Sequence, residues 1–238
     1  MEQSFIKFIN GIKNKPNTYV VLGGDLLDNC TRTSVGSVFS QTMSPSQQKM
    51  EMVNILKPIK DRILCIIPGN HELRSEKDGN CQLVWDIAAI LGIEHLYRDN
   101  IAFMNIQLGS QTNKSGSRKS GSIRPSYNCV IAHGSGGGVL PGSFVNKSTN
   151  FGYYIDGLDL ILVGHCHKPF NITPAKIQMD VRNKRVSFKP FEVVCASSWL
   201  TWAGYAARGM MPPTSYCEQT ITLCANKKKI IYQKSAVI

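Results

Sequence analysis

Short, mainly apolar runs that give way to polar residues recur along the chain. Four of them are four to six residues long and cover residues 19–22, 63–67, 129–132 and 158–163. Runs of this kind are typical of buried strands in an α/β sheet. An aspartate, asparagine or histidine follows each run within three residues. Because ligands gather at the carboxyl ends of strands in open α/β sheets, we expect these polar side chains to converge at one edge.

Apolar residues at helical spacing separate some of these runs. Residues 5–12 have this spacing, and the helix they predict should end before Pro16. A second helix is predicted over residues 46–56, with Ser46 as its candidate N-cap. A third is predicted over residues 83–91.

The remaining segments are less regular. A strand is predicted over residues 101–108, and a loop rich in Ser, Gly, Lys and Arg over residues 109–126. Residues 184–223 have the pattern of strands and turns, and a lysine cluster follows at 227–229. A length of 238 residues accommodates one sizeable core, so we predict a single α/β domain over residues 1–238.

The chain is strongly basic. Twenty-seven lysines and arginines against 16 acidic residues give a net charge of +11 and a pI near 9.3. Such a field attracts anionic partners, whether polynucleotide, phosphorylated substrate or acidic lipid, and does not choose among them. An excess of lysine that only keeps the protein soluble is an equally common explanation.

The cysteines and the apolar runs indicate a compartment. The eight cysteines are scattered, form no C-x-x-C pair, and several lie inside apolar runs, which favours reduced thiols over a disulfide framework or a zinc finger. No stretch approaches 18 uninterrupted apolar residues, and the N-terminus has no apolar segment with a small-residue cleavage site. We therefore expect a cytoplasmic protein with no membrane partner.

The polar residues that follow the strands are suited to binding metal ions; they are Asp25, Asn70, His133, His165 and His167. Carboxylate and amide oxygens mixed with imidazoles suit Mn, Fe or Zn, whereas the absence of clustered cysteine disfavours a thiolate site. Two ions roughly 3.5–4 Å apart can hold a hydroxide between them and stabilise both oxygens of a phosphoryl displacement. Asp25 is the only acid in the set, so we assign it the bridge. The glycine-rich residues 134–138 leave a second interpretation open, a flexible loop or a phosphate-binding nest.

Four short motifs in this order together resemble the calcineurin-like metallophosphoesterase family; they are G-D-L-L-D at 24–28, G-N-H-E at 69–72, H-G at 133–134 and G-H-C-H at 164–167. The resemblance implies an α/β sandwich of two mixed β-sheets flanked by helices. It also implies hydrolysis of a phosphoester by a dinuclear metal centre.

The resemblance implies a role for each matched residue. Asp25 would bridge two ions. One ion would also bind Asn70, His133 and His165, and the other would bind His167. We expect manganese, with iron, zinc and magnesium as alternatives.

Three further residues have implied roles beside the metal ions. His71 would not bind metal; it would lie by the phosphate and either stabilise its charge or protonate the leaving oxygen. Asp28 and Glu72 are candidates for orienting His71 or a metal ligand, with ordinary capping or surface solvation as the alternative.

The chain departs from the family pattern at its start. Family members carry an Asp-x-His element at the end of the first strand, which supplies two ligands to the ion that also binds the residue matching His167. No such element is present, and the remaining histidine, His95, is expected in a loop. We therefore expect the first strand to be missing, through truncation, a misplaced start codon or natural loss. One position would then have four protein ligands and the other only Asp25 and His167, which predicts one well-bound ion and one weak or empty position.

A phosphodiesterase or nuclease acting on nucleic acid, similar to the repair-exonuclease branch, is the leading hypothesis. The net charge, the basic loop at 114–124 and an aromatic and basic cluster favour it; the cluster contains Trp199, Trp202, Tyr205 and Arg208. Aromatic residues spaced by three are also common in cores, so this evidence is indirect.

Two alternatives remain. A phosphomonoesterase of the protein-phosphatase type is suggested by Arg74 after G-N-H-E. Against it, Asn29-Cys30 and Pro68 stand where phosphoprotein phosphatases carry Arg-Gly and a phosphate-binding arginine, and a site without those guanidiniums neutralises a dianion less well. The other alternative is a catalytically impaired, basic nucleic-acid-binding module.

Overall fold

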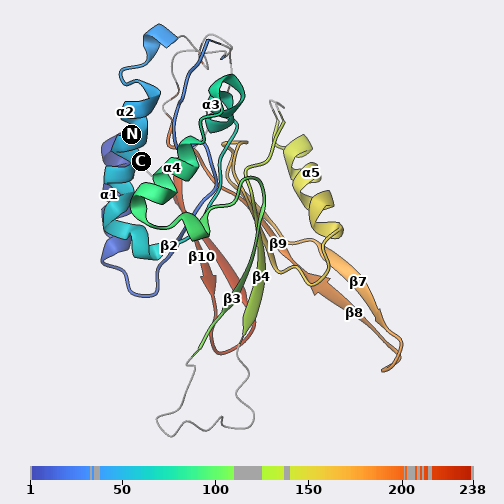
Figure 1. The fold of residues 1–238 in the computed structure, drawn as a ribbon. Coiled ribbons are helices and arrows are strands. Elements are labelled where there is room, and N and C mark those ends of the chain that lie inside the picture. Colours follow the sequence, from blue (N-terminus) through green and yellow to red (C-terminus); the bar gives the residue numbers. More distant parts are fainter. Residues whose placement is uncertain are drawn as a thin grey trace, which may run out of the picture.

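A mixed five-stranded sheet forms the centre of the fold (Figure 1). Its strands are, in spatial order, Ala102–Gln107 (β3), Ser126–Ala132 (β4), Leu160–Val163 (β5), Glu192–Cys195 (β9) and Phe170–Ile172 (β6). The central strands β4, β5 and β9 run parallel, whereas β3 and β6 run antiparallel to their neighbours. The carboxyl ends of β4 and β5 therefore lie side by side.

The computed structural model describes part of the 238-residue chain, namely residues 2–32, 34, 38–109, 125–136, 140–200, 202, 207, 210, 212–213 and 216–236. The basic loop predicted at 114–124 lies outside these residues, as do Tyr205 and Arg208.

Two strand pairs form a second layer. The pairs are the parallel strands Val20–Leu22 (β1) and Ile63–Ile66 (β2), and the antiparallel strands Cys217–Leu223 (β10) and Ile230–Ala236 (β11). Side chains of both pairs pack against one face of the five-stranded sheet in a shared core, whose buried members include Cys65, Tyr127, Ile131 and Leu160. Strands alternate their side chains between faces, so Ile161 and Val163 point into a different core from Leu160.

Helices cover the outer faces of both layers (Figure 1). Glu2–Lys13 (α1), Pro45–Leu56 (α2) and Leu83–Leu91 (α4) share a core with β1 and β2 that buries Ile9, Leu56, Ile66 and Ile87. Gly142–Tyr153 (α5) covers the outer face of the five-stranded sheet, where Phe144 packs in one cluster with Val130, Ile161 and Val193. The predicted α/β fold, with strand layers flanked by helices, is confirmed.

Six shorter or peripheral elements complete the fold; they are Glu72–Gly79 (α3), the hairpin strands Ala175–Asp180 (β7) and Arg185–Pro190 (β8), and the 3₁₀ turns Val38–Ser40 (η1), Lys57–Arg62 (η2) and Glu94–Leu96 (η3). His95, predicted in a loop, lies in η3. None of the described helices is both long and apolar enough to cross a membrane.

The predicted elements that have regular apolar spacing are present. The helices expected at 5–12 and 83–91 are α1 and α4, and the four apolar runs correspond to β1, β2, β4 and β5. Helices α3 and α5 were not predicted, because their sequences ELRSEKDG and GSFVNKSTNFGY are mostly polar and lack a clear apolar stripe.

The predicted N-cap of α2 was wrong by two residues. Ser44, not Ser46, is the cap, and Pro45 takes the first helical position. Ser44 and Gln47 form a capping box, in which the Gln47 side chain accepts the Ser44 backbone N–H at 2.9 Å. Proline at the first helical turn fits because its missing N–H has no helical partner there.

The aromatic cluster proposed as a base-stacking surface is partly used for packing. The Trp199 ring lies 5.5 Å from the Phe5 ring and 5.3 Å from the Phe8 ring, measured between centroids. Trp199 thus packs the segment after β9 against α1. Trp202 is 47% exposed and remains accessible to a ligand.

The capping box gives a first prediction. Ser44→Ala removes the side-chain acceptor of the Gln47 N–H and should lower the free energy of unfolding by about 1 kcal/mol. Ser46→Ala, which changes the same residue type two positions into the helix, should leave it within roughly 0.5 kcal/mol. Urea unfolding followed by circular dichroism measures both, and equal losses would show that Ser44 does not act as the cap.

Candidate metal centre

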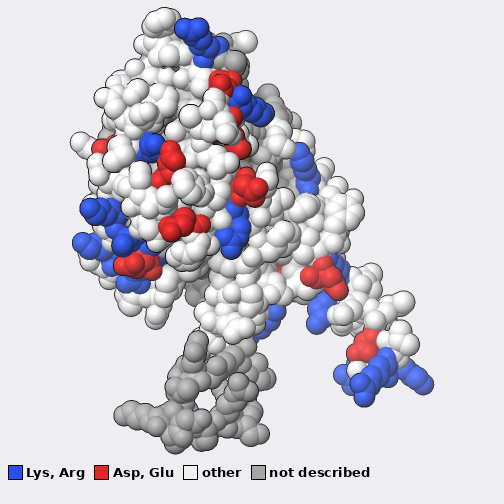
Figure 2. All heavy atoms as spheres, in the orientation of Figure 1, with Lys and Arg blue, Asp and Glu red and all other residues white. Residues whose placement is uncertain are grey.

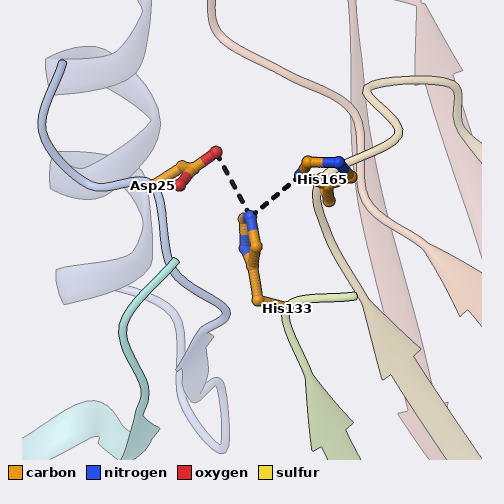
Figure 3. Close-up of side chains that lie close together, drawn as sticks. All are labelled: Asp25, His133 and His165. Carbon is orange, nitrogen blue, oxygen red and sulfur yellow. Dashed lines mark hydrogen bonds and ion pairs between the residues drawn. The ribbon is translucent and has the colours of Figure 1, made fainter. Parts of the chain in front are cut away.

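Four predicted ligands lie on loops at the carboxyl ends of four strands; Asp25 follows β1, Asn70 follows β2, His133 follows β4 and His165 follows β5. Figure 3 shows Asp25, His133 and His165 turned toward one another. One ligand atom from each of these three residues lies within 4.8 Å of the other two. The two strand layers thus contribute to the same point.

Four acceptor atoms meet at this point. The His133 Nε2 atom lies 3.2 Å from Asp25 Oδ2 and 3.0 Å from Asn70 Oδ1. The His165 Nδ1 atom lies 2.8 Å from the same Asn70 oxygen and 3.3 Å from His133 Nε2. The atoms are therefore close enough to share one small cation.

Backbone carbonyls fix the tautomers of both imidazoles. His133 Nδ1 lies 2.8 Å from the Gly23 carbonyl oxygen, and His165 Nε2 lies 3.0 Å from the Gly136 carbonyl oxygen. A carbonyl only accepts, so each of these nitrogens carries a hydrogen, and in the neutral ring the other nitrogen directs its lone pair at the shared point. This is the arrangement of metal-binding histidines, whose second nitrogen donates to a carbonyl or carboxylate. The donor set of one carboxylate, one amide oxygen and two imidazoles fits a divalent cation.

The charges of the cluster suit metal binding. Burial alone would raise the pKa of Asp25, but the hydrogen bond to His133 and the positive charges of His133 and His71 outweigh it and lower that pKa to about 2. For His133, burial acts to lower the pKa, and the hydrogen bond and negative charge of Asp25 outweigh it, so its pKa is raised. Burial, reinforced by the charge of His133, lowers the pKa of His165. Asp25 is thus held ionised and His165 neutral, the forms that bind metal, whereas the proton that Asp25 favours on His133 would leave when metal binds.

A family model for calcineurin-like phosphoesterases matches residues 2–169, more than half of the chain. The chain belongs to the calcineurin-like phosphoesterase family. Searches of curated proteins and of solved structures gave no match. The family implies divalent metal ions and hydrolysis of phosphoester bonds, and the matched segment ends just after His167.

Several residues of this calcineurin-like phosphoesterase centre have strained backbones. Asp25, His165 and His167 have φ angles of 53°, 54° and 56°, in the left-handed region that residues with side chains rarely adopt. Such strain persists where surrounding contacts impose it and is frequent at functional sites.

His167 lies near the centre but outside the group of three. Burial lowers its pKa, the Asp25 charge acts to raise it, and the charges of His165, His71 and His133 act to lower it. His167 is thus within electrostatic range of Asp25 and of these three histidines, and its neutral form is favoured. Its predicted place in a second metal shell stays a prediction.

His71 lies beside the centre rather than in it. Its backbone N–H donates to Asp25 Oδ1 at 3.0 Å, and its ring Nδ1 lies 2.9 Å from the Asp28 carbonyl oxygen. The ring Nε2 is 3.9 Å from Asp25 Oδ2, too far for a hydrogen bond. Within the described part of the chain, Nε2 makes no hydrogen bond. Asp28 contacts His71 mainly through its main chain, because its carboxylate oxygen is 3.8 Å from Nδ1.

Glu72 joins the two loops that carry Asp25 and Asn70. Its buried carboxylate accepts three backbone N–H groups: those of Asp25 at 3.0 Å, Leu27 at 2.8 Å and Gly69 at 2.8 Å. Burial raises the pKa of Glu72, and the hydrogen bonds from Leu27 and Gly69 counteract it. Among the described residues, Glu72 makes no hydrogen bond to the His71 ring or to a ligand side chain, so its hydrogen bond to Asp25 is made with the backbone N–H.

The two loops touch at a pair of glycines. A Cβ atom on Gly24 would lie 2.5 Å from the Gly69 nitrogen, and one on Gly69 would lie 2.1 Å from Asp25 Oδ1. Both distances are impossible for real atoms, so the G-D and G-N-H-E motifs need glycine here to bring their backbones into contact.

Asn29 supports the site and was missed as a site residue. Its side chain is fully buried, donates to the His71 carbonyl oxygen at 2.7 Å and accepts from the Ser75 hydroxyl at 2.7 Å. Its backbone N–H donates to Gln48 of α2 at 3.0 Å. The available signal was an asparagine just after a ligand motif, a position that favours a left-handed turn, and its φ is 43°. No sequence signal marks the Gly23 and Gly136 carbonyls.

The carboxylate of Glu72 gives a second prediction. Glu72→Gln places an amide against one of the buried N–H groups and should lower the free energy of unfolding by about 2 kcal/mol. It should also weaken metal binding, because the Asp25 and Asn70 loops are no longer fixed together. Glu76→Gln on the same helix, whose carboxylate accepts a hydrogen bond from the Gln82 side-chain amide at 3.4 Å, is the matched control. Urea unfolding and calorimetric titration with Mn²⁺ measure both effects, and metal affinity unchanged in Glu72→Gln would contradict this role.

Proposed function

We propose that this calcineurin-like phosphoesterase is a metal-dependent phosphodiesterase that acts on nucleic acid. The observation that carries the proposal is the convergence of Asp25 Oδ2, Asn70 Oδ1, His133 Nε2 and His165 Nδ1, with His71 Nε2 beside them at 3.9 Å from Asp25 Oδ2. A divalent ion bound there supplies Lewis-acid activation of water and of a phosphoryl oxygen.

Manganese is the proposed ion, with iron, zinc and magnesium as alternatives, because the donor set mixes hard oxygens with imidazoles. The four converging donors support one tightly bound ion. A second position would draw only on Asp25 and His167 from this chain, so we propose that it is weak or empty.

His71 is proposed to act on the phosphate. Its Nδ1–H is held by the Asp28 carbonyl, which also accepts from Arg74 Nη1 at 3.2 Å, so the ring is fixed in one orientation. When Nε2 is protonated, it can stabilise negative charge on the phosphoryl group or give its proton to the leaving oxygen.

A diester is favoured over a monoester by the charge near the site. A monoester is a dianion and calls for guanidinium groups, but Asn29 and Pro68 stand at the positions where phosphoprotein phosphatases carry them, and both are buried. The guanidinium of Arg74, which follows G-N-H-E, donates to the Asp28 carbonyl oxygen at 3.2 Å. The net charge of +11 supports a polyanionic substrate. All eight cysteines are free thiols, which supports a reducing compartment such as the cytoplasm.

The division of roles gives a third prediction. Asp25→Ala and His165→Ala should both abolish tight Mn²⁺ binding and metal-dependent turnover, since each removes a donor from the cluster. His71→Ala should lower kcat by roughly 10²- to 10⁴-fold and leave the Mn²⁺ dissociation constant within about threefold. Calorimetric titration gives affinity and stoichiometry together, with one tight equivalent expected. If His71→Ala lost the metal as completely as His165→Ala, His71 would be a ligand.

Substrate class gives a fourth prediction. With Mn²⁺, bis-p-nitrophenyl phosphate should be hydrolysed with a kcat/KM at least about tenfold above that of p-nitrophenyl phosphate, and labelled DNA should be cleaved. The Asp25→Ala variant is the blank for contaminating activity. A preference for the monoester would instead support a phosphatase. Turnover of neither substrate, with salt-sensitive DNA binding, would support a binding module that has lost catalysis.

A further inference from the structure

The β7–β8 hairpin is a two-stranded ribbon that projects from the body of the molecule (Figure 1). β7 and β8 pair with each other and with no other described strand. Of their twelve residues, only Lys176 is partly buried. A lone two-stranded ribbon is at best marginally stable in water, so this one needs either firm anchoring or a partner.

One face of the ribbon is apolar. Ile177 lies opposite Phe188 and Met179 lies opposite Val186, and directly opposed residues of antiparallel strands share a face. Together with Val181 in the turn, these side chains are between 64% and 84% exposed. A contiguous apolar patch of this kind marks an interaction site, whereas scattered exposed residues do not.

The other face and the turn are basic. Arg185 and Lys189 lie on the polar face, Arg182 and Lys184 lie in the turn, and Figure 2 shows blue side chains gathered at the end of the ribbon. The acid of the ribbon, Asp180, accepts from the Asn183 amide at 2.7 Å and its backbone N–H at 3.0 Å. The ribbon therefore combines an apolar face with four cations.

The base of the ribbon is fixed to the body. Lys176 donates to the Ile155 carbonyl oxygen, and its ammonium lies 5.9 Å from the centre of the Phe191 ring. The Phe191 N–H donates to the Pro174 carbonyl at 3.0 Å. These contacts hold the ribbon away from the core, so its apolar face is not covered by the described body of the chain.

The charge of the ribbon and the area of its apolar face indicate which kind of partner binds it. Two copies joined by this face would bring two basic ribbons together and would bury on the order of 500 Å² each, less than the roughly 800 Å² per partner of a stable interface. A nucleic acid would bind the cations and leave the apolar face in water. An anionic membrane surface satisfies both features, because the apolar side chains enter the acyl boundary while Lys and Arg reach the headgroups.

We propose that the β7–β8 hairpin docks the protein on anionic lipid membranes. The apolar face enters the interface, and the four cations contribute about 1 kcal/mol each at an anionic surface. The expectation of no membrane partner was based on the lack of an apolar stretch long enough to cross a membrane, which surface docking does not need. The cytoplasmic leaflet, which carries anionic lipids, is the surface that fits the proposed compartment.

Vesicle binding by the full chain gives the fifth prediction. The protein should float with phosphatidylcholine vesicles that contain phosphatidylserine and remain in solution with phosphatidylcholine alone. The double variant Ile177→Ser/Phe188→Ser should reduce partitioning at least tenfold, and Arg182→Glu/Lys184→Glu should do the same. Phe103→Ser, on β3 and also exposed at 68%, is the matched control and should bind normally. Circular dichroism melting should be unchanged in both hairpin variants, because the hairpin lies outside the core, and this measurement does not depend on catalysis.

Tryptophan fluorescence measures directly whether the apolar face of the hairpin enters the membrane. The emission maximum of the Phe188→Trp variant should shift to shorter wavelength when anionic vesicles are added, whereas that of the Phe103→Trp variant should not. Normal vesicle binding by Ile177→Ser/Phe188→Ser would overturn the proposal, because it would show that the protein is held on the vesicles by its positive charge alone. Absence of vesicle binding would also overturn it. In that case, a dimer that is lost in Ile177→Ser/Phe188→Ser would show that the apolar face binds a second copy. DNA binding that is lost in Arg182→Glu/Lys184→Glu would show that the ribbon binds nucleic acid.

Discussion

The candidate centre depends on one buried carboxylate. Glu72 accepts the N–H groups of Asp25, Leu27 and Gly69, so a single side chain joins the loop after β1 to the loop after β2. A buried carboxylate without hydrogen bonds costs several kcal/mol of desolvation free energy. The three N–H groups offset this cost only while the β1 loop and the β2 loop are both in place. The loops are therefore coupled, and the side chains of Asp25 and Asn70 are positioned as one unit.

The other half of the centre is set by backbone geometry. The Gly23 carbonyl fixes the tautomer of His133, and the Gly136 carbonyl fixes that of His165. Gly23 belongs to the β1 loop, so the loop that supplies Asp25 also orients a histidine from the neighbouring layer. Left-handed backbone at Asp25, His165 and His167 is the conformational cost of directing these groups to one point.

The sequence allowed prediction of the residues that converge but not of the contacts that make them converge. Each of the four strands could be inferred because an apolar run and a polar motif are adjacent in the chain. The bonds from Glu72 to Asp25 and Leu27 cross 47 and 45 residues, and no periodicity encodes a partner at such a separation. Asn29, bound to His71 across 42 residues, was missed for the same reason. The N-cap of α2 was predicted at Ser46 instead of Ser44. The local signal for Ser44 is the proline that follows it, because proline favours the first helical position.

The β7–β8 ribbon is subject to a different constraint from the rest of the chain. Its apolar side chains belong to none of the three buried clusters, so replacing them removes no packing from the described core. In a chain without a partner, water-exposed Ile177, Met179 and Phe188 would add only a risk of aggregation. We attribute the alternation of apolar and polar residues along the ribbon to what the ribbon binds, whereas the alternation in β4 and β5 follows from the two cores between which they lie. Both patterns have the period of a strand, and only the structure separates a face that packs from a face that docks.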